Sequence, residues 1–305
     1  MKLSDTKYKI SGAAILCNLL WGSAYPGIKI GYELFNITDS VPQKLFFAGL
    51  RFVLAGIMVL LVSIPVNKKL PRLSRNNVGI IALTGVVYTA MQYVFFYIGL
   101  SNTSGSNGSI VNSTTTFMAI IVSRVFFKER IGWTKVLGTL TGFAGVIVIL
   151  SAGSTGGFSF YGEGFILIAA MCFVAGSLIS KKAASSSDAM TATGFNLLIG
   201  GIILLLWGLI GGGTLVRIST GGILILLYLA FLSAAAFTIW TFLLREVSVS
   251  RISIFNFLIP VSGTILSAIF MKENIWDIHY LVSLILVCAG IFLVNRENSG
   301  FMKNP

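Results

Sequence analysis

Several side chains that could bind a small polar molecule recur at helical spacing within long apolar stretches. The first stretch places Trp21 and Tyr25 four residues apart, in line with Asn18 and Lys29. Residues three or four positions apart share one face of a helix. Two aromatic rings on that face could form a wall against a substrate side chain or could bind a cation. Helix packing, or a position at the membrane interface, is the alternative explanation for both rings.

The third, sixth and eighth apolar stretches contribute further candidates. In the third, Tyr88, Gln92 and Phe96 follow one another at steps of four residues. The Gln92 amide is costly in hydrocarbon unless it is paired, so we expect it to face the interior. Trp240 in the eighth stretch is a candidate because its indole N–H needs a partner away from lipid. Ser177 in the sixth is also a candidate, although small hydroxyl side chains often serve only helix packing.

Matching polar stripes run along the fourth and ninth stretches. Asn112 and Thr116 lie four residues apart in the fourth stretch, and Asn256 lies in the ninth. The stripes also contain Ser109 and Ser123 in the fourth stretch and Ser253, Pro260, Thr264 and Ser267 in the ninth. An amide both donates and accepts hydrogen bonds, which suits a carboxylate or an amine. The two asparagines therefore either bind a ligand or join two parts of the chain.

Charged residues are nearly absent from the interiors of these stretches. All ten Asp and Glu residues lie at stretch ends, in loops or in tails, and the only histidine, His279, is near the start of the last stretch. Proton-driven carriers usually place a titratable group inside the membrane, so we expect downhill transport or exchange. Arg51 is the one basic residue clearly inside a stretch. It could attract an anion, although a buried structural partner or an outward, snorkelling position explains it better.

Recognisable catalytic and cofactor motifs are missing from the sequence. It shows no cluster with metal-ligand spacing, no phosphate-binding loop and no nucleophile–base pair. These are the signatures of metalloenzymes, nucleotide-driven pumps and covalent catalysts. We therefore expect no enzyme activity and no cofactor.

Composition places the chain in a membrane. Of 305 residues, 55% are hydrophobic and 10% are charged, whereas a soluble domain has about 25% charged residues. A helix needs roughly 20 apolar residues to cross a ~30 Å hydrocarbon core. Ten stretches meet this length, at 10–32, 43–65, 77–99, 104–126, 133–151, 162–181, 190–213, 220–243, 249–271 and 277–295. We predict an all-α polytopic membrane protein with ten transmembrane helices.

The net charge of +12 is explained by orientation in the membrane. If the chain begins in the cytoplasm, seventeen Lys and Arg residues fall on the inner side and five on the outer side. The five are Lys29, Lys44, Arg51, Arg217 and Lys272. This asymmetry follows the positive-inside rule and predicts that both termini are cytoplasmic. We expect membrane lipid and a small-molecule substrate as partners, and no nucleic acid.

An internal repeat divides the chain into two halves. The segment 127–131 (FKERI) recurs as 271–275 (MKENI), and 143–148 (FAGVIV) recurs as 288–293 (CAGIFL), at offsets of 144 and 145 residues. Five spans per copy force the second copy to enter the bilayer from the opposite side. Inverted repeats of this kind present one central site to each membrane face in turn. We predict a first five-helix repeat at 1–152 and a second, inverted repeat at 153–305.

Short motifs resemble those of a known family. The run 18–23 (NLLWGS) followed by Lys29, Arg51 in the second span, and the Lys-Glu pairs 128–129 and 272–273 are similar to EamA-type carriers of the drug/metabolite transporter superfamily. The resemblance implies ten helices in two inverted halves around a cavity lined mainly by spans one, three, four, six, eight and nine. It also implies transport of amino acids, amines or other small metabolites, often outward. The family commonly has a proline in the fourth span where this chain has Thr116, while Pro260 retains it in the ninth, so the two halves are expected to bend unequally.

These observations together predict a secondary transporter in the cell membrane. We expect an exporter or exchanger of small metabolites, with amino acids as the preferred class, working by alternating access. Uptake of an amine or another small metabolite is the alternative, followed by a channel and then a membrane-embedded enzyme. We expect a monomer or a homodimer.

Overall fold

Helices account for all regular secondary structure in the described chain. The computed structural model describes residues 3–38, 40–127, 132–152, 158–186, 188–246 and 253–296. A helix satisfies its own backbone N–H and C=O groups, as hydrocarbon surroundings require. The elements are α1 (Leu3–Leu34), α2 (Val41–Asn67), α3 (Arg75–Thr84), η1 (Gly85–Met91), α4 (Gln92–Ser101), α5 (Gly105–Asn112), α6 (Thr114–Phe127), α7 (Trp133–Ala152), η2 (Phe160–Gly164), α8 (Phe165–Ser186), α9 (Ala189–Ile210), α10 (Thr220–Glu246), η3 (Ser253–Phe257), α12 (Leu258–Met271) and α13 (Ile278–Arg296).

Within the described ranges, six helical segments are long and apolar enough to cross a membrane. They are Val41–Asn67, Arg75–Ser101, Trp133–Ser151, Phe160–Ser180, Ala189–Ile210 and Thr220–Leu243, and the shorter apolar helices are Phe255–Met271 and Ile278–Val294. The prediction of an all-helical polytopic membrane protein is therefore confirmed. The first predicted span lies within α1, and the fourth is divided into α5 and α6.

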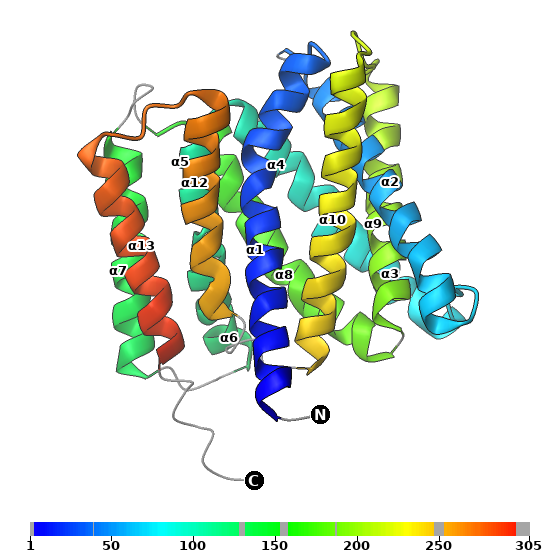
Figure 1. Ribbon diagram of the computed structural model, residues 1–305, viewed down its shortest axis with the longest axis horizontal. Helices are drawn as coiled ribbons and strands as arrows, with labels where there is room; N and C mark the ends of the chain where they lie inside the picture. The colour runs from blue at the N-terminus through cyan, green and yellow to red at the C-terminus, as the bar shows by residue number, and fades with distance from the viewer. Residues whose placement is uncertain are drawn as a thin grey trace.

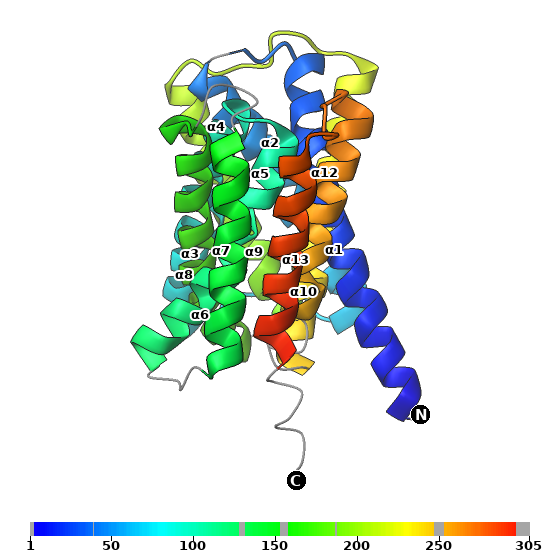
Figure 2. The same cartoon turned by 90° about the vertical axis from the view of Figure 1, so that its left-hand side faces the viewer.

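The helices stand side by side in one bundle (Figures 1 and 2). At one edge α2 packs along α9, and at the other α7 packs along α13. Between these pairs, α1 contacts both α10 and α12, while α8 contacts α3, η1 and α4. The start of α1 and the end of α13 lie at the same end of the bundle, here called the terminal end (Figure 1). The segments 35–38, 211–219 and 272–277 lie at the opposite end, here called the far end.

Glycines allow the edge helices to approach closely. A Cβ atom on Gly56 of α2 would lie 2.6 Å from the backbone nitrogen of Leu198 in α9. On Gly290 of α13 it would lie 2.6 Å from the carbonyl oxygen of Gly138 in α7. Small residues at such crossings bring helix backbones into contact, which is how helices associate in lipid. The α2–α9 and α7–α13 pairs are thus held by backbone contact.

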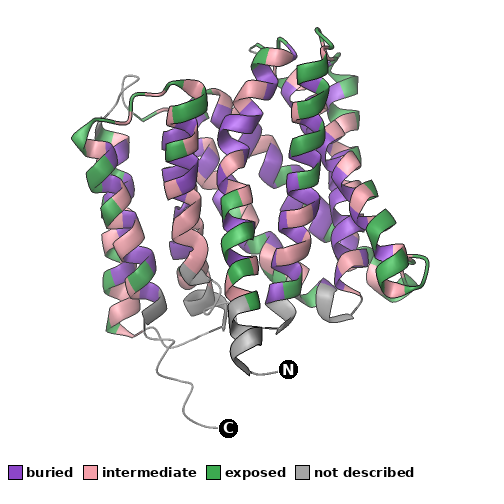
Figure 3. Ribbon diagram, viewed as in Figure 1, coloured by how far each residue is buried: buried purple, intermediate pink, exposed green. Residues whose placement is uncertain are grey.

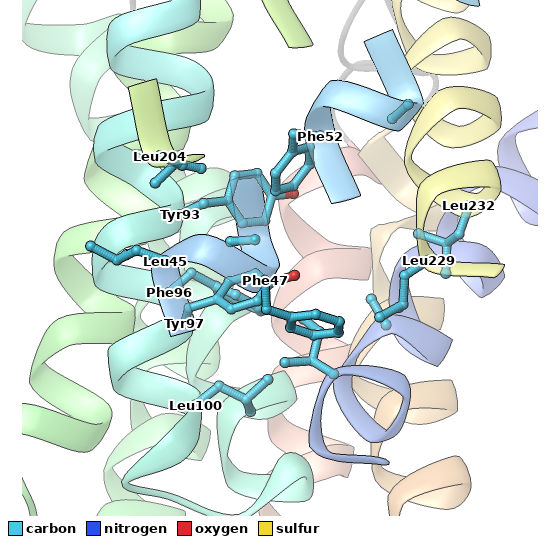
Figure 4. Close-up of a cluster of buried hydrophobic side chains, with 14 of the residues drawn as sticks. Leu45, Phe47, Phe52, Tyr93, Phe96, Tyr97, Leu100, Leu204, Leu229 and Leu232 are labelled. Carbon is cyan, nitrogen blue, oxygen red and sulfur yellow. The ribbon is translucent and has the colours of Figure 1, made fainter. Parts of the chain in front are cut away.

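Burial separates an inner from an outer surface of the bundle (Figure 3). The largest buried cluster gathers aromatic and aliphatic side chains from α2, α4, α9 and α10, including Leu45, Phe47, Phe52, Tyr93, Phe96, Tyr97, Leu100, Leu204, Leu229 and Leu232 (Figure 4). Large apolar side chains on the outer surface remain exposed, among them Leu61, Trp207, Ile210 and Phe231. A continuous apolar exterior of this kind is suited to contact with lipid chains.

Candidate functional site

A cavity of about 70 Å³ lies inside the bundle. A single water needs only about 10–15 Å³ by the same kind of measure, so several waters would fit. Its walls come from both halves of the chain: Trp21, Ala24, Tyr25, Arg51, Gln92, Tyr93, Phe96, Asn112, Ser113, Thr115, Thr116, Phe173, Trp240, Asn256 and Ile259. Eight of the ten side chains singled out from the sequence are among them: Trp21, Tyr25, Gln92, Phe96, Asn112, Thr116, Trp240 and Asn256.

Aromatic rings form one wall of the cavity. The Trp21 ring lies 5.2 Å from that of Trp240 and 6.1 Å from that of Phe173, measured between centroids. The Tyr25 ring meets the Phe96 ring edge-on at 5.5 Å. Such tilted and edge-to-face contacts are the favoured arrangements of aromatic pairs. The rings therefore hold one another in place and present a rigid apolar surface to the cavity.

A break in the fourth span brings Asn112 to the cavity. The hydroxyl groups of Ser113, Thr114 and Thr115 donate to the carbonyl oxygens of the residues three positions earlier. Hydroxyl groups that bond to nearby carbonyls compete with the helical hydrogen bonds and bend a helix. The α-helix stops at Asn112 and resumes at Thr114. This run of hydroxyl residues supplies a break in a span that lacks the proline expected at Thr116.

The ninth span bends in a different way. Residues 253–257 form the tighter 3-10 turn η3, and α12 continues from Leu258 with Pro260 in its first turn. Proline is tolerated in a first helical turn because that N–H has no helical acceptor. Asn256, within the 3-10 turn, lines the cavity together with Asn112. The expectation of unequal bending agrees with these two different breaks.

The predicted polar stripes face each other across the two halves. The side-chain nitrogen of Asn256 donates to Thr116 Oγ1 over 3.3 Å. Ser109 Oγ lies 3.3 Å from Thr264 Oγ1, closer to the far end. The Asn112 side chain in turn lies beside the Tyr25 hydroxyl of α1. The stripes thus join the halves and border the cavity at once.

Two buried carbonyl oxygens at the cavity lack a hydrogen-bond partner within the described chain. They are Gln92 Oε1 and Asn256 Oδ1. An unpaired buried acceptor costs about 1–3 kcal/mol. A ligand or water with an N–H or O–H group in the cavity would satisfy both atoms.

Arg51 projects from α2 into the same region. Its side chain is 1% exposed. Nε donates to Ser233 Oγ over 2.8 Å, and Nη1 donates to the Tyr97 hydroxyl over 3.0 Å. The guanidinium carbon also lies 4.9 Å from the centre of the Phe52 ring. Arg51 therefore has buried structural partners, as expected, and also lines the cavity.

Tyr88 and Ser177, the other two candidates, lie outside the cavity lining. The Tyr88 ring packs between those of Phe173 and Phe237, at 5.0 and 5.5 Å. Its hydroxyl faces Ser177. Tyr88 lies within the π-helical segment η1, which ends just before Gln92.

Several lining residues were not anticipated as candidates. Tyr93 follows Gln92 directly, and Phe173 lies four residues before Ser177. Nothing in the spacing distinguishes these rings from ordinary packing residues. Ser113 and Thr115 belong to the break, which the run of four hydroxyl residues at 113–116 could have signalled. The motif residues Lys128 and Glu129 lie outside the described residues.

Acidic groups in the described chain lie away from the cavity lining. Glu163 accepts from Thr103 and from the backbone N–H of Ser159, 3.0 Å away, near the far end. Asp277 pairs with His279 at an exposed position before α13. The backbone N–H and the ring of His279 donate to the carboxylate and lower the pKa of Asp277. Neither carboxylate contributes charge at the cavity.

Comparison with known proteins gives a consistent assignment. The sequence profile of the EamA-like transporter family matches residues 9–151 and again 160–296. The chain is 28% identical to a chloroplastic WAT1-related protein of Arabidopsis thaliana, over 90% of this chain and 66% of that protein. It is 27% identical to the uncharacterized inner membrane transporter YedA of Escherichia coli K12, over 92% of this chain and 89% of that protein.

Two further similarities extend this picture. The chain is 28% identical to the uncharacterized transporter YvbV of Bacillus subtilis, over 92% of this chain and 89% of that protein. A solved crystal structure superposes with a TM-score of 0.71, at 16% identity and over 95% of this chain and 99% of that one, which shows a shared fold. Together with the apolar spans, these matches identify a multi-pass transporter of the plasma membrane. The chain belongs to the EamA-like transporter family.

Proposed function

We propose that this protein is a secondary carrier that exports or exchanges small metabolites, amino acids in particular, by alternating access. The observation that carries the proposal is the central cavity. It combines rigid aromatic rings with unpaired amide oxygens at the point where two spans are broken. Broken helices around a site between repeats are a recurring feature of secondary transporters.

The arrangement of helices supports ten spans in two inverted halves, at 1–152 and 153–305. The first helix of each half contacts the third and fourth spans of the other half. Thus α1 packs on α10 and α12, and α8 packs on α3 and α4 and on α5 and α6. The start of α7 lies at the terminal end and the segment 272–277 at the far end (Figure 2). The repeat copies therefore point in opposite directions, and the family profile matches each half separately.

The distribution of basic residues supports cytoplasmic termini. In the ten-span arrangement the sequence predicts seventeen Lys and Arg residues on the side of the termini and five on the opposite side. By the positive-inside rule the far end then faces outward. In this orientation we infer that the structure is closed to the outside. At the outward-facing end α5 packs along α12, whereas α6 lies against α7 and α8.

The surroundings of the cavity favour transport without proton coupling. In the described chain its lining contains neither a carboxylate nor a histidine. Downhill movement or exchange of substrates would then drive transport. Substrate-dependent acidification inside liposomes, reported by a pH-sensitive dye and abolished by mutating a membrane residue, would contradict this part of the proposal.

Counterflow in proteoliposomes tests the carrier function. Liposomes loaded with an unlabelled amino acid should accumulate the labelled amino acid, and uptake should saturate. Trp240→Ala should abolish this accumulation because it removes a ring from the cavity wall. Trp207→Ala is the matched control, since Trp207 is 57% exposed on the outer surface. Unsaturable, channel-like conductance would contradict the proposal, as would equal activity of the two variants.

A further inference from the structure

We propose that Arg51 binds the carboxylate of the transported molecule. The proposal deepens the carrier function above and rests on it. The guanidinium group of Arg51 carries a positive charge, as guanidinium groups do in proteins. It lies beside the cavity, and its side chain is 1% exposed. A buried, permanent positive charge needs a physical explanation.

The partners of Arg51 do not neutralise this charge. Its hydrogen-bond acceptors are Ser233 Oγ, the Leu229 carbonyl oxygen and the Tyr97 hydroxyl, all of them uncharged. Among the described residues, none of the Asp or Glu side chains forms an ion pair with it. A buried charge without a counter-ion is costly. The neutral contacts orient the guanidinium and leave its charge available.

The guanidinium also retains free donors. It has five N–H groups. The recorded hydrogen bonds use the single N–H of Nε and one N–H of Nη1. The described chain offers no hydrogen bond to the other three. Two parallel N–H groups of a guanidinium match the two oxygens of a carboxylate, which is the strongest geometry available to such a pair.

The remaining cavity groups suit the rest of an amino acid. Gln92 Oε1 and Asn256 Oδ1 are buried acceptors without partners in the described chain, and both can accept from an ammonium group. Both are uncharged, whereas Arg51 carries a full charge. The aromatic wall around Trp21 would receive an apolar side chain. The carboxylate should therefore matter more for binding than the ammonium group.

A ligand series on the unaltered protein tests this ranking. Phenylalanine, 3-phenylpropionate and phenethylamine share one side chain and differ only in their charged groups. Leucine, 4-methylpentanoate and isoamylamine form a second series with a smaller side chain. Binding can be followed by quenching of tryptophan fluorescence or by thermal shift. We expect each amine to bind at least about tenfold more weakly than its amino acid, as loss of a charge-assisted contact implies. Each acid should lose less than the corresponding amine.

Variants of Arg51 provide a second, independent measurement. In each series, Arg51→Gln should weaken binding of the amino acid and of the acid by about tenfold or more. It should leave binding of the amine unchanged or stronger. Tyr97→Phe is the matched control, because it removes one hydrogen bond of Arg51 and keeps the charge. If Arg51→Gln does not fold, the ligand series on the unaltered protein decides alone.

The outcomes separate the two proposals. Amines that bind and exchange as well as the amino acids would overturn the role of Arg51 and leave the carrier function standing. Carboxylate binding that Arg51→Gln leaves unchanged would do the same. Failure of every compound in both series to bind or exchange would overturn the amino-acid carrier and this inference with it.

Discussion

In the carrier proposed above, Glu273 would hold the far end of the bundle closed, and its substitution by Gln should open it. The carboxylate follows α12 and accepts from the backbone N–H groups of Gly105 and Ser106, at 2.7 and 2.9 Å, at the start of α5. The Ser106 hydroxyl donates to it as well, over 2.6 Å. Lys29 of α1 interacts with the same carboxylate electrostatically. One side chain thus joins the ends of α1, α5 and α12.

The size of the effect follows from these contacts. Glu273→Gln removes the charge and leaves one accepting oxygen, so at least one charge-assisted hydrogen bond is lost. Such a bond contributes about 1.5–3 kcal/mol. The attraction between a carboxylate and a helix N-terminus, about 0.3–1 kcal/mol, is lost too. Because Glu273 is half-buried, solvent screens both contributions, and we take about 1.5–3 kcal/mol for their sum. A change of about 1.5–3 kcal/mol multiplies the open population roughly 10- to 140-fold.

Thiol labelling measures this population. The native Cys17, Cys172 and Cys288 are first replaced by Ala, and Ser109→Cys is introduced as a reporter. Ser109 is fully buried between α5 and α12 in the closed state. A membrane-impermeant maleimide added from outside reacts with this cysteine only while the far end is open. Its labelling rate should therefore rise with Glu273→Gln by the same factor.

Glu33→Gln provides the matched control. Glu33 lies at the far end of α1, is exposed, and also interacts with Lys29. The substitution removes the same charge without touching α5, so labelling should stay within about threefold of the parent, as expected for a surface charge. Equal labelling rates in the two variants would refute the reasoning, because the effect would then come from charge alone.

Three further substitutions test the packing and the caps. Gly290→Ala places a Cβ atom 2.6 Å from a backbone oxygen of α7 and should destabilise the protein by about 1–3 kcal/mol, seen as a lower unfolding temperature, whereas Gly79→Ala meets open space and should not. Asp188→Ala removes the N-cap of α9 and should cost about 1–2 kcal/mol, while Asp188→Asn retains an acceptor and should unfold near the parent temperature. His279 lowers the pKa of Asp277, so the stabilisation from this contact is present above the ordinary carboxyl pKa and is lost as the pH falls through the lowered value. The difference in unfolding temperature between the parent and Asp277→Asn should shrink over that acidic interval, and a difference independent of pH would contradict the assignment.

Much of the candidate site could be predicted from the sequence because polar groups are rare in an apolar chain. Gln92, Asn112 and Asn256 attract notice since hydrocarbon offers them no partner. Their spacing fixes the helix face on which each lies, and that face turned out to border the cavity. Trp240 followed from the same reasoning, because a buried indole N–H also needs a partner, whereas Trp21 was predicted as part of an aromatic wall with Tyr25.

Departures from regular helix geometry could not be predicted in the same way. Tyr88 was grouped with Gln92 on the assumption of an unbroken α-helix, whereas it lies in the π-helical η1 and its ring packs between those of Phe173 and Phe237. Tyr93 and Phe173 resemble any other buried rings until the helices are placed. Hydropathy locates the spans, but it averages over many residues. It therefore misses the short breaks and non-α turns that decide which side chain points inward.

The contact between α2 and α9 has a mechanical consequence. At Gly49, Gly56, Gly201 and Gly208 a Cβ atom would lie 2.4–2.6 Å from backbone of the opposite helix. At these positions backbone packs directly on backbone. No flexible side chains lie between the two helices to let one slide past the other. In the proposed transport cycle this pair would stay fixed, and the large displacements would fall to helices that meet through hydroxyl groups and rings, such as α5 and α12.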